Sequence, residues 1–122
     1  MKDKNKIYDL KERTFQLSLN IIYFARKIPF NSIDNIIIKQ LVRSITSIGA
    51  NYEEADEAYP KPDFFYKIGI AKKEAKESKY WLSLIKASFK LENKDIELCN
   101  NFIKETIELT KISNSILKNR SS

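Results

Sequence analysis

The sequence predicts an all-α protein: a single domain, residues 1–122, folded as an antiparallel up-and-down four-helix bundle. Only 2 glycines and 3 prolines occur in the 122 residues, which favours long elements joined by few turns. Apolar residues recur at alternating intervals of three and four, the spacing of helices that bury one face. Three short breaks separate four helical segments, so neighbouring helices are expected to run in opposite directions.

The first two helices are expected at about residues 8–27 and 35–58. Pro29 ends the first helix, because proline disfavours helical geometry in the residue before it. The second begins near Ser32 to Asn35, whose short polar side chains can cap a helix, and the prolines within residues 59–62 end it. The expected core residues are Leu10, Leu17, Ile21, Phe24 and Ile28 in the first helix, and Ile38, Leu41, Ile45, Ile48, Tyr52 and Ala55 in the second.

The last two helices are expected at about residues 63–89 and 95–117. Pro62 suits the first turn of the third helix, and residues 91–94 form the short break before the fourth. The expected core residues are Ile68, Ala71, Ala75, Ser78, Leu82, Ile85 and Phe89 in the third helix, and Leu98, Phe102, Leu109, Ile112 and Ile116 in the fourth. Small residues in the middle of the third helix permit close approach of a neighbour.

Polar residues form a second stripe on the second helix, roughly opposite its apolar one. The members of this stripe are Arg43, Ser47, Asn51 and Glu54. Short polar groups between an arginine and a carboxylate suit a surface where polar groups must find partners. The third helix also has a second face, although Trp81 could equally cover the end of its own core. The members of this face are Tyr66, Lys73, Glu77, Tyr80, Trp81 and Leu84. We expect these two faces to form an interface between subunits.

Two segments of the sequence carry a family resemblance. They are R-S-I-T-S-I-G-A-N-Y-E-E-A, residues 43–55, and F-F-Y-K-I-G-I-A-K-K-E-A-K-E-S-K-Y-W-L, residues 64–82. The first fits the pattern R-x-x-x-S-I-x-x-N-x-x-E, and Ala71 and Glu77 in the second fit A-x-x-x-x-x-E. In these motifs the chain resembles, over most of its length, the bacterial family called four-helix bundle proteins, or 23S rRNA intervening-sequence proteins.

The resemblance implies a left-handed antiparallel bundle that assembles into a ring, with homopentamers known in the family. Some relatives are encoded inside intervening sequences of 23S rRNA genes. A similar protein is the accessory variability protein of diversity-generating retroelements, which binds nucleic acid and a reverse transcriptase. None of these relatives is established as an enzyme. The family motifs are matched at Arg43, Ser47, Asn51, Glu54 and Glu77, in agreement with the second packed face inferred from the residues.

The chain is basic, with a formal net charge of +6 and a pI of about 9.3. Lysines recur along one flank of the third helix: Lys72, Lys76, Lys79, Lys86 and Lys90. Such a stripe can contact RNA or DNA phosphates, without sequence-specific readout because no aromatic-and-basic recognition signature accompanies it. Two alternatives stay open. The lysine stems can simply cover apolar helix edges, as in a protein-interaction scaffold, and A/T-rich codons can supply part of the lysine excess.

The composition argues against an enzyme and against a metal or other cofactor. Glu74 and Glu77 lie three residues apart on the third helix, but the chain has no histidine, so the Glu-x-x-His pairs of di-metal bundles are missing. The acidic end of the second helix, residues 53–57, is expected to be solvated or paired with Arg43 or Lys73 of a neighbouring subunit.

The remaining expectations concern location and small residues. Cys99 is the only cysteine, so no intramolecular disulfide is expected, and a buried thiol in a reducing cytoplasm is the simplest interpretation. No apolar run approaches the roughly 18 residues of a membrane span, which predicts a soluble cytoplasmic protein without membrane contact. Gly49 and Gly69 are expected to permit close helix packing.

Overall fold

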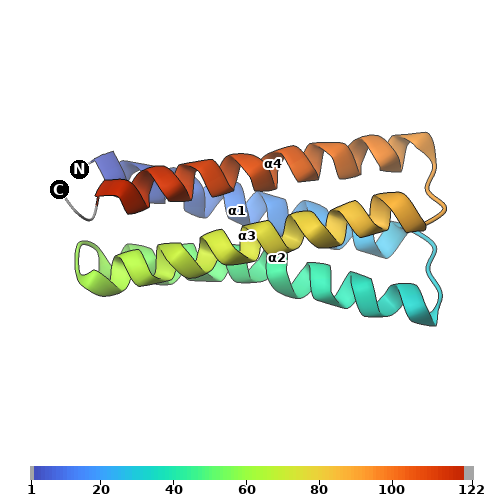
Figure 1. The fold of residues 1–122 in the computed structure, drawn as a ribbon, viewed down its shortest axis with the longest axis horizontal. Helices are drawn as coiled ribbons and strands as arrows, with labels where there is room; N and C mark the ends of the chain where they lie inside the picture. Colours follow the sequence, from blue (N-terminus) through green and yellow to red (C-terminus); the bar gives the residue numbers. More distant parts are fainter. Residues whose placement is uncertain (1, 120–122) are drawn as a thin grey trace.

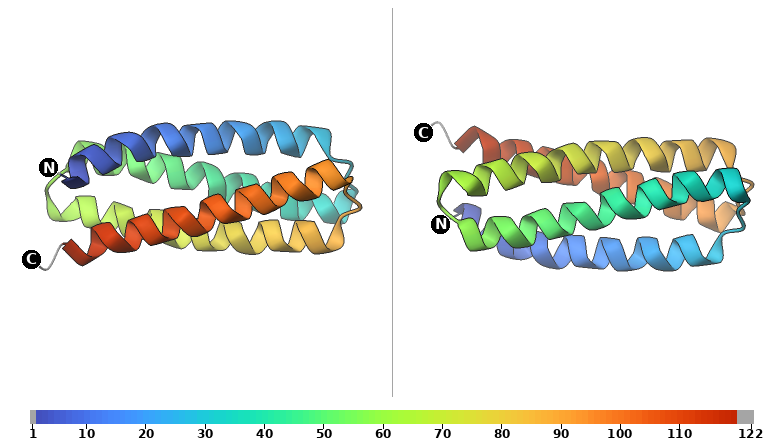
Figure 2. Two further views of the ribbon diagram at one scale, coloured as in Figure 1. Left: turned by 90° about the horizontal axis from the view of Figure 1, so that it is seen from above. Right: turned by 90° about the horizontal axis from the view of Figure 1, so that it is seen from below.

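The computed structural model describes residues 2–119, and its side chains from residue 9 onward. The described chain forms four α-helices and no strand: α1 (Lys2–Lys27), α2 (Ser32–Ala58), α3 (Pro62–Ser88) and α4 (Asn93–Lys118). Figures 1 and 2 show the α1–α2 and α3–α4 connections at one end of the molecule and the α2–α3 connection at the other. The prediction of an all-α protein with four helices is confirmed.

The helix starts differ from those predicted. α1 begins at Lys2 rather than near residue 8, because a polar first turn with lysines and an aspartate has no apolar period yet still forms helix. α2 begins at Ser32 rather than near residue 35. Its N-cap is Asn31, whose side-chain oxygen accepts a hydrogen bond from the Asp34 backbone N–H at 2.8 Å. The starts of α3 and α4 lie one and two residues earlier than predicted.

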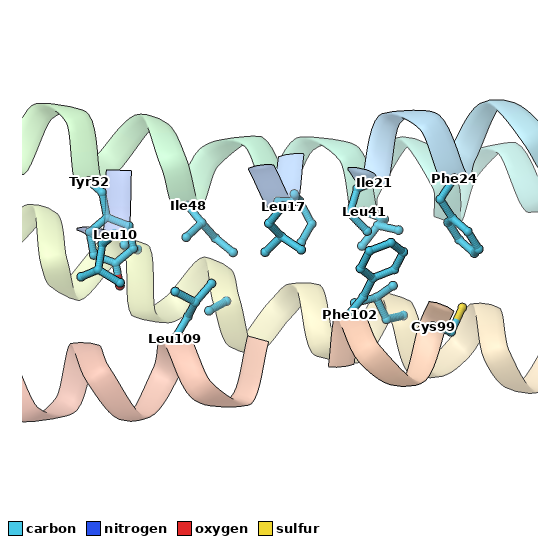
Figure 3. Packing of buried hydrophobic residues seen from close by; sticks show 14 of the residues in the cluster. Leu10, Leu17, Ile21, Phe24, Leu41, Ile48, Tyr52, Cys99, Phe102 and Leu109 are labelled. Carbon is cyan, nitrogen blue, oxygen red and sulfur yellow. The ribbon is translucent and has the colours of Figure 1, made fainter. Parts of the chain in front are cut away.

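The helices bury the apolar stripes predicted for them. Every expected core residue of the first three helices is buried, together with Phe102, Leu109 and Ile116 of α4 (Figure 3). Leu98 and Ile112 are partly buried at the edge of this core. α2 and α3 pack closely along their lengths, as do α3 and α4, whereas α1 packs mainly on α2 and contacts α4 little. The bundle is therefore most tightly held where α3 meets its two neighbours.

Buried hydroxyl groups connect the helices inside this core. Ser44 of α2 and Ser78 of α3 share a hydrogen bond of 2.7 Å between their Oγ atoms. Tyr52 of α2 is likewise hydrogen-bonded to Ser113 of α4. Because a buried hydroxyl without a partner is costly, these pairs fix the register of the three helices.

The two glycines differ in what surrounds them. A Cβ atom on Gly49 would lie 3.4 Å from Thr14 Oγ1, so this glycine sits where α1 and α2 approach closely, as predicted. A Cβ atom on Gly69 would meet nothing within 4 Å. The prediction that Gly69 permits close helix packing is therefore wrong within the chain, because the residue faces open space instead. No helix within residues 2–119 carries an apolar stretch long enough to cross a membrane.

Candidate nucleic-acid interface

α3 carries two separate groups of charged side chains. Its carboxylates Glu74 and Glu77 lie on the side that faces α2, and most of its lysines lie along the groove that it forms with α4. The helical period sets this division, because residues three or four apart share a face whereas neighbours in sequence do not. The two sides are described in turn.

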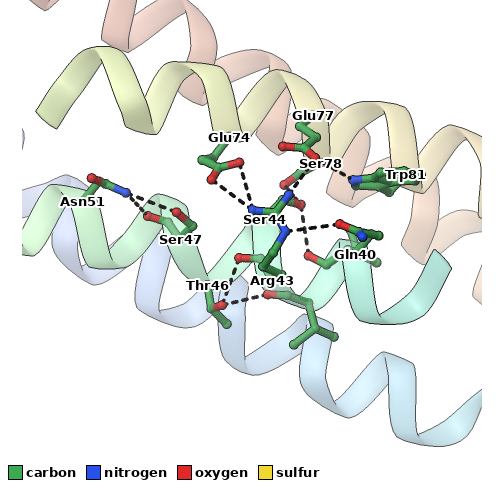
Figure 4. A network of polar contacts seen from close by, with 12 residues as sticks. Gln40, Arg43, Ser44, Thr46, Ser47, Asn51, Glu74, Glu77, Ser78 and Trp81 are labelled. Carbon is green, nitrogen blue, oxygen red and sulfur yellow. Dashed lines mark hydrogen bonds and ion pairs between the residues drawn. The ribbon is translucent and has the colours of Figure 1, made fainter. Parts of the chain in front are cut away.

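On the side facing α2, one arginine holds both carboxylates of α3 (Figure 4). The guanidinium of Arg43 donates to Glu77 Oε1 at 2.6 Å through Nη2 and to Glu74 Oε2 at 3.2 Å through Nη1. Its Nε also donates to the Gln40 side-chain oxygen at 3.2 Å. The Glu74 side chain is only 11% exposed, so its charge depends on this arginine, whereas Arg43 itself is 47% exposed.

The network shifts the pKa values of Arg43 and Glu77. The hydrogen bond to Glu77 is the main cause that raises the pKa of Arg43, against the opposing effect of desolvation. The hydrogen bond from Arg43 is likewise the main cause that lowers the pKa of Glu77 below its usual range. The indole N–H of Trp81, 3.4 Å from Glu77 Oε1, acts in the same direction. Both groups are therefore charged at neutral pH.

The other residues of the predicted α2 stripe have partners within the chain as well. Asn51 donates to the backbone oxygen of Ser47 at 2.8 Å and to its hydroxyl at 3.2 Å. Glu54 forms an ion pair of 2.7 Å with Lys67 of α3. Arg43 and Glu54 thus pair with α3 rather than with each other. The ion pairs of Arg43 and Glu54 join α2 to α3, and the prediction that the stripe also meets another subunit stays a prediction.

On the other side of α3, the surface between α3 and α4 contains three cavities in a row, with volumes of about 550, 460 and 630 Å³. The first and second share Lys76, and the second and third share Ser83, so the cavities form one continuous groove. We call it the α3–α4 groove. Seven lysines line it: Lys72, Lys73, Lys76, Lys79 and Lys86 from α3, and Lys104 and Lys111 from α4.

The lysines of the α3–α4 groove are not neutralised by the chain. None of the residues lining the three cavities is acidic, and none of the seven lysines forms an ion pair with another residue of the described part. The floor of the groove is apolar and consists of the half-buried side chains Ile70, Ile103, Ile107 and Leu117. Two exposed tyrosines, Tyr66 and Tyr80, stand along it. The groove therefore combines positive edges with an apolar base.

The lysines that line the groove differ in part from those predicted to contact nucleic acid. Lys72, Lys76, Lys79 and Lys86 line it, but Lys90 lies in the α3–α4 connection and does not. Lys73 was predicted in the subunit interface beside Glu77, yet it lines the groove with the other lysines. Lys104 and Lys111 were missed. Lys104 and Lys111 are seven residues apart, which is about two helical turns, so the sequence already indicated that they share one face of the fourth helix.

Elsewhere, the acidic end of α2 is solvated as expected at Glu53, Glu54 and Glu57, which are exposed, and some of its carboxylates also have partners within the chain. Lys11 of α1 contacts both Glu53 and Asp56, at 3.5 and 3.0 Å. Within residues 9–119 no group of three or more histidine, cysteine, aspartate or glutamate side chains is arranged to hold a metal ion. Cys99 is buried, and burial, with Asp95 in second place, raises the pKa of its thiol to about 11. Such a thiol is a poor nucleophile at neutral pH.

Comparison with known proteins identifies similar sequences and structures. The sequence profile of the family described as 23S rRNA-intervening sequence protein matches residues 6–115. The crystal structure of a protein with unknown function from the S23 ribosomal protein family of Bacteroides thetaiotaomicron VPI-5482 is similar, with a TM-score of 0.72 and 32% identity. That alignment covers 89% of this chain and 98% of the other. No curated protein matches the chain.

Proposed function

Because the chain belongs to the 23S rRNA-intervening sequence protein family, we propose that it is a non-enzymatic protein that binds the phosphate backbone of RNA or DNA. The observation that carries the proposal is the α3–α4 groove, in which lysines from two helices line up without a carboxylate partner. Lys90, close in sequence to the end of α3, would extend the same surface. Binding of this kind is electrostatic and carries no base-specific readout.

The physical reason is the cost of an unbalanced charge. Lysines gathered on one surface repel each other, and the chain offers carboxylates to Arg43, Lys11 and Lys67 but none to the groove. A polyanion removes this repulsion and releases its own condensed counterions, which favours binding at low salt. A cytoplasmic location would give the protein access to such a partner.

A salt titration tests the proposal. The affinity for a labelled RNA is measured by fluorescence anisotropy at several salt concentrations, and it should fall linearly in a log–log plot. Each single-strand phosphate that is neutralised adds about 0.7 to the slope. The variant Lys72→Glu/Lys76→Glu/Lys79→Glu should bind weakly and with a slope lower by about 2.

The matched control is Arg26→Glu/Lys27→Glu/Lys39→Glu. It makes the same change in net charge at three exposed positions of α1 and α2 that form no ion pair with a described residue. This control should retain most of the affinity. The proposal is wrong if the wild type does not bind at low salt, or if both variants lose the same affinity.

We also propose that antiparallel bundles of this chain assemble into a ring, a homopentamer as the family resemblance implies. The proposed contacts are Arg43, Ser47, Asn51, Glu54, Lys73, Glu77 and Trp81. Large apolar side chains exposed on α1, on α2 and between them support contact with another chain: Phe15, Tyr23, Phe30, Ile33 and Ile36. Multi-angle light scattering measures the subunit number, and a monomeric wild type at all concentrations would contradict the ring.

A protein-interaction scaffold is the second candidate function, and the same exposed apolar residues favour it. A reverse transcriptase is one such partner that the family resemblance implies. The genomic position discriminates between the candidates, since a gene inside a 23S rRNA gene points to ribosomal RNA and one beside a reverse transcriptase points to a retroelement. If the charge is incidental, removing the lysines of the α3–α4 groove will leave all partner binding intact.

A further inference from the structure

We propose that the α3–α4 groove is a site for single-stranded nucleic acid, in which bases stack on Tyr66 and Tyr80 while the lysines hold the phosphates. The inference rests on the proposed function. It adds that the ligand is single-stranded and names the residues that contact its bases. Its basis is the composition of the groove, which has basic edges, an apolar floor and two exposed rings.

The apolar floor distinguishes the two kinds of nucleic acid. A duplex presents phosphates and sugars to a protein surface and keeps its base faces stacked inside, so it has nothing to place against Ile70, Ile103 or Ile107. A single strand exposes its base faces. Stacking on aromatic side chains within a positively charged groove is the usual way in which proteins bind single strands without reading their sequence.

The tyrosines are available for such stacking. Tyr80 is 58% exposed and Tyr66 is 64% exposed, and Lys67 Nζ lies over one face of the Tyr66 ring, 6.0 Å from its centroid. The Tyr80 ring meets Trp81 edge-to-face with 5.2 Å between centroids, a contact that orients the ring. The two tyrosines are 14 residues apart, which is about 21 Å along the helix, so they would contact separate bases of one strand.

The dimensions of the groove agree with a short strand. Its lining on α3 runs from Phe65 to Ala87, about 33 Å of helix, and single-strand sites commonly take 4–16 nucleotides. The axes of packed helices are typically about 8–10 Å apart, so the surface groove between α3 and α4 is too narrow to admit a duplex. Gly69 lines the first cavity and leaves space there that any side chain would occupy.

Charge argues against a second copy of the chain as the occupant. A copy that presented the same face would bring seven further lysines against those already there. An acidic helix of another protein would balance the charge of the lysines. The two exposed tyrosine rings spaced along the groove are better explained by the stacked bases of a nucleic acid. Binding of an acidic peptide in preference to single-stranded RNA would assign the groove to such a helix.

The test compares a ten-nucleotide single-stranded RNA with a duplex of the same length, each labelled and measured by fluorescence anisotropy at one salt concentration. The wild type should bind the single strand more tightly. Tyr80→Ala should weaken single-strand binding by about 5- to 150-fold and duplex binding by less than about twofold. Tyr80→Phe keeps the ring and should retain the affinity.

Two further variants show whether a loss of binding comes from the groove itself or from a loss of folding. Gly69→Leu fills the first cavity without changing charge, and it should weaken single-strand binding although leucine favours helix more than glycine does. Tyr23→Ala, the control, truncates a ring on α1 outside the groove that is 51% exposed, and it should leave the preference for single-stranded over duplex RNA unchanged. Circular dichroism melts confirm that each variant is folded.

The outcomes separate this inference from the proposed function. Equal binding of both RNAs, or equal losses for both in Tyr80→Ala, would overturn the single-strand site while leaving backbone binding intact. Absence of binding to either RNA at low salt would overturn both. Tyr80-dependent binding of a labelled acidic peptide, without a preference for single-stranded RNA, would assign the groove to a protein partner and overturn the inference.

Discussion

The two sides of α3 differ in whether their charged side chains have partners of opposite charge within the chain. Toward α2, Glu74 and Glu77 meet the guanidinium of Arg43, so the charges there are matched within the chain. Toward α4, seven lysines line a groove that contains no carboxylate. The matched side contributes to the stability of the bundle. The unmatched side lacks such ion pairs, and it is the surface to which the proposed function assigns the nucleic acid.

This difference teaches where function is to be sought in the molecule. The residues that are most recognisable in sequence, those of the Arg43 motif, serve the contact between α2 and α3. The residues that look like an ordinary solvated flank are the ones without partners. Four substitution experiments can test this contrast between the two sides of α3.

Replacing the arginine should have the largest effect. Arg43→Ala leaves the buried Glu74 carboxylate without its partner, which should lower the free energy of unfolding by about 1–3 kcal/mol in urea denaturation. The affinity for RNA should stay within about twofold. Arg26→Ala removes the same charge at an exposed site and should be nearly neutral. If the two variants are equally stable, the Arg43 network does not hold α2 to α3.

The buried serine pair beside this network gives the next effect. Ser78→Ala should lower the free energy of unfolding by about 1 kcal/mol, because Ser44 loses its partner on α3. The double variant Ser44→Ala/Ser78→Ala should cost less than the sum of the two single variants, since neither helix then buries an unpaired hydroxyl. Additive losses in this cycle would mean that the hydroxyl pair is not coupled.

Acid should weaken the matched side of α3 first. The pKa of Glu77 is lower in the folded protein than its ordinary value of 4.5, so the native state binds fewer protons than the unfolded state there. Its contribution to stability is fully present above pH 4.5 and is lost as the pH falls through the lower folded pKa. Urea denaturation between pH 6 and 3 should therefore show a smaller acid loss for Glu77→Gln than for the wild type. The control Glu57→Gln changes an exposed position, and its free energy of unfolding should fall with pH as much as that of the wild type.

A single carboxylate in the groove should give the smallest change in stability. Ser83 lies four residues after Lys79 and three before Lys86, on the surface between them. Ser83→Glu should therefore stabilise the helix by about 0.2–0.5 kcal/mol and at the same time weaken RNA binding severalfold. Ser83→Gln adds the same bulk without charge, and it should change both the stability and the RNA affinity by less. A gain in RNA affinity for Ser83→Glu would contradict the role given to the groove.

Much of the fold could be predicted because it depends on local pattern. The apolar stripes of the first three helices were predicted residue by residue, since a period of 3.6 places those residues on one face whatever the helix packs against. Errors arose where no period exists. The polar first turn of α1 carries no apolar signal, and the Asn31 cap replaced the one expected between Ser32 and Asn35.

The candidate site was predictable only in part. Four of the five chosen lysines line the groove, because they share one flank of α3. Tyr66, Lys73 and Tyr80 were predicted on the second face of the third helix, and the structure places them along the α3–α4 groove. Contact of this face with another subunit stays a prediction. Lys104 and Lys111 belong to another helix, and nothing in the spacing of α3 indicates which flank of α4 will lie beside it.

The sequence by itself determined the four helices, their buried stripes, the basic character of the chain and the absence of histidine chemistry. These properties follow from composition and from periodicity within each helix. The tertiary structure decided which helix lies beside which, and thereby that Arg43 meets Glu74 and Glu77 while the seven lysines of the α3–α4 groove form no ion pair with a described residue. The physical reason is that a charged side chain finds its partner across helices, at a distance that depends on packing and not on the spacing of residues along one helix.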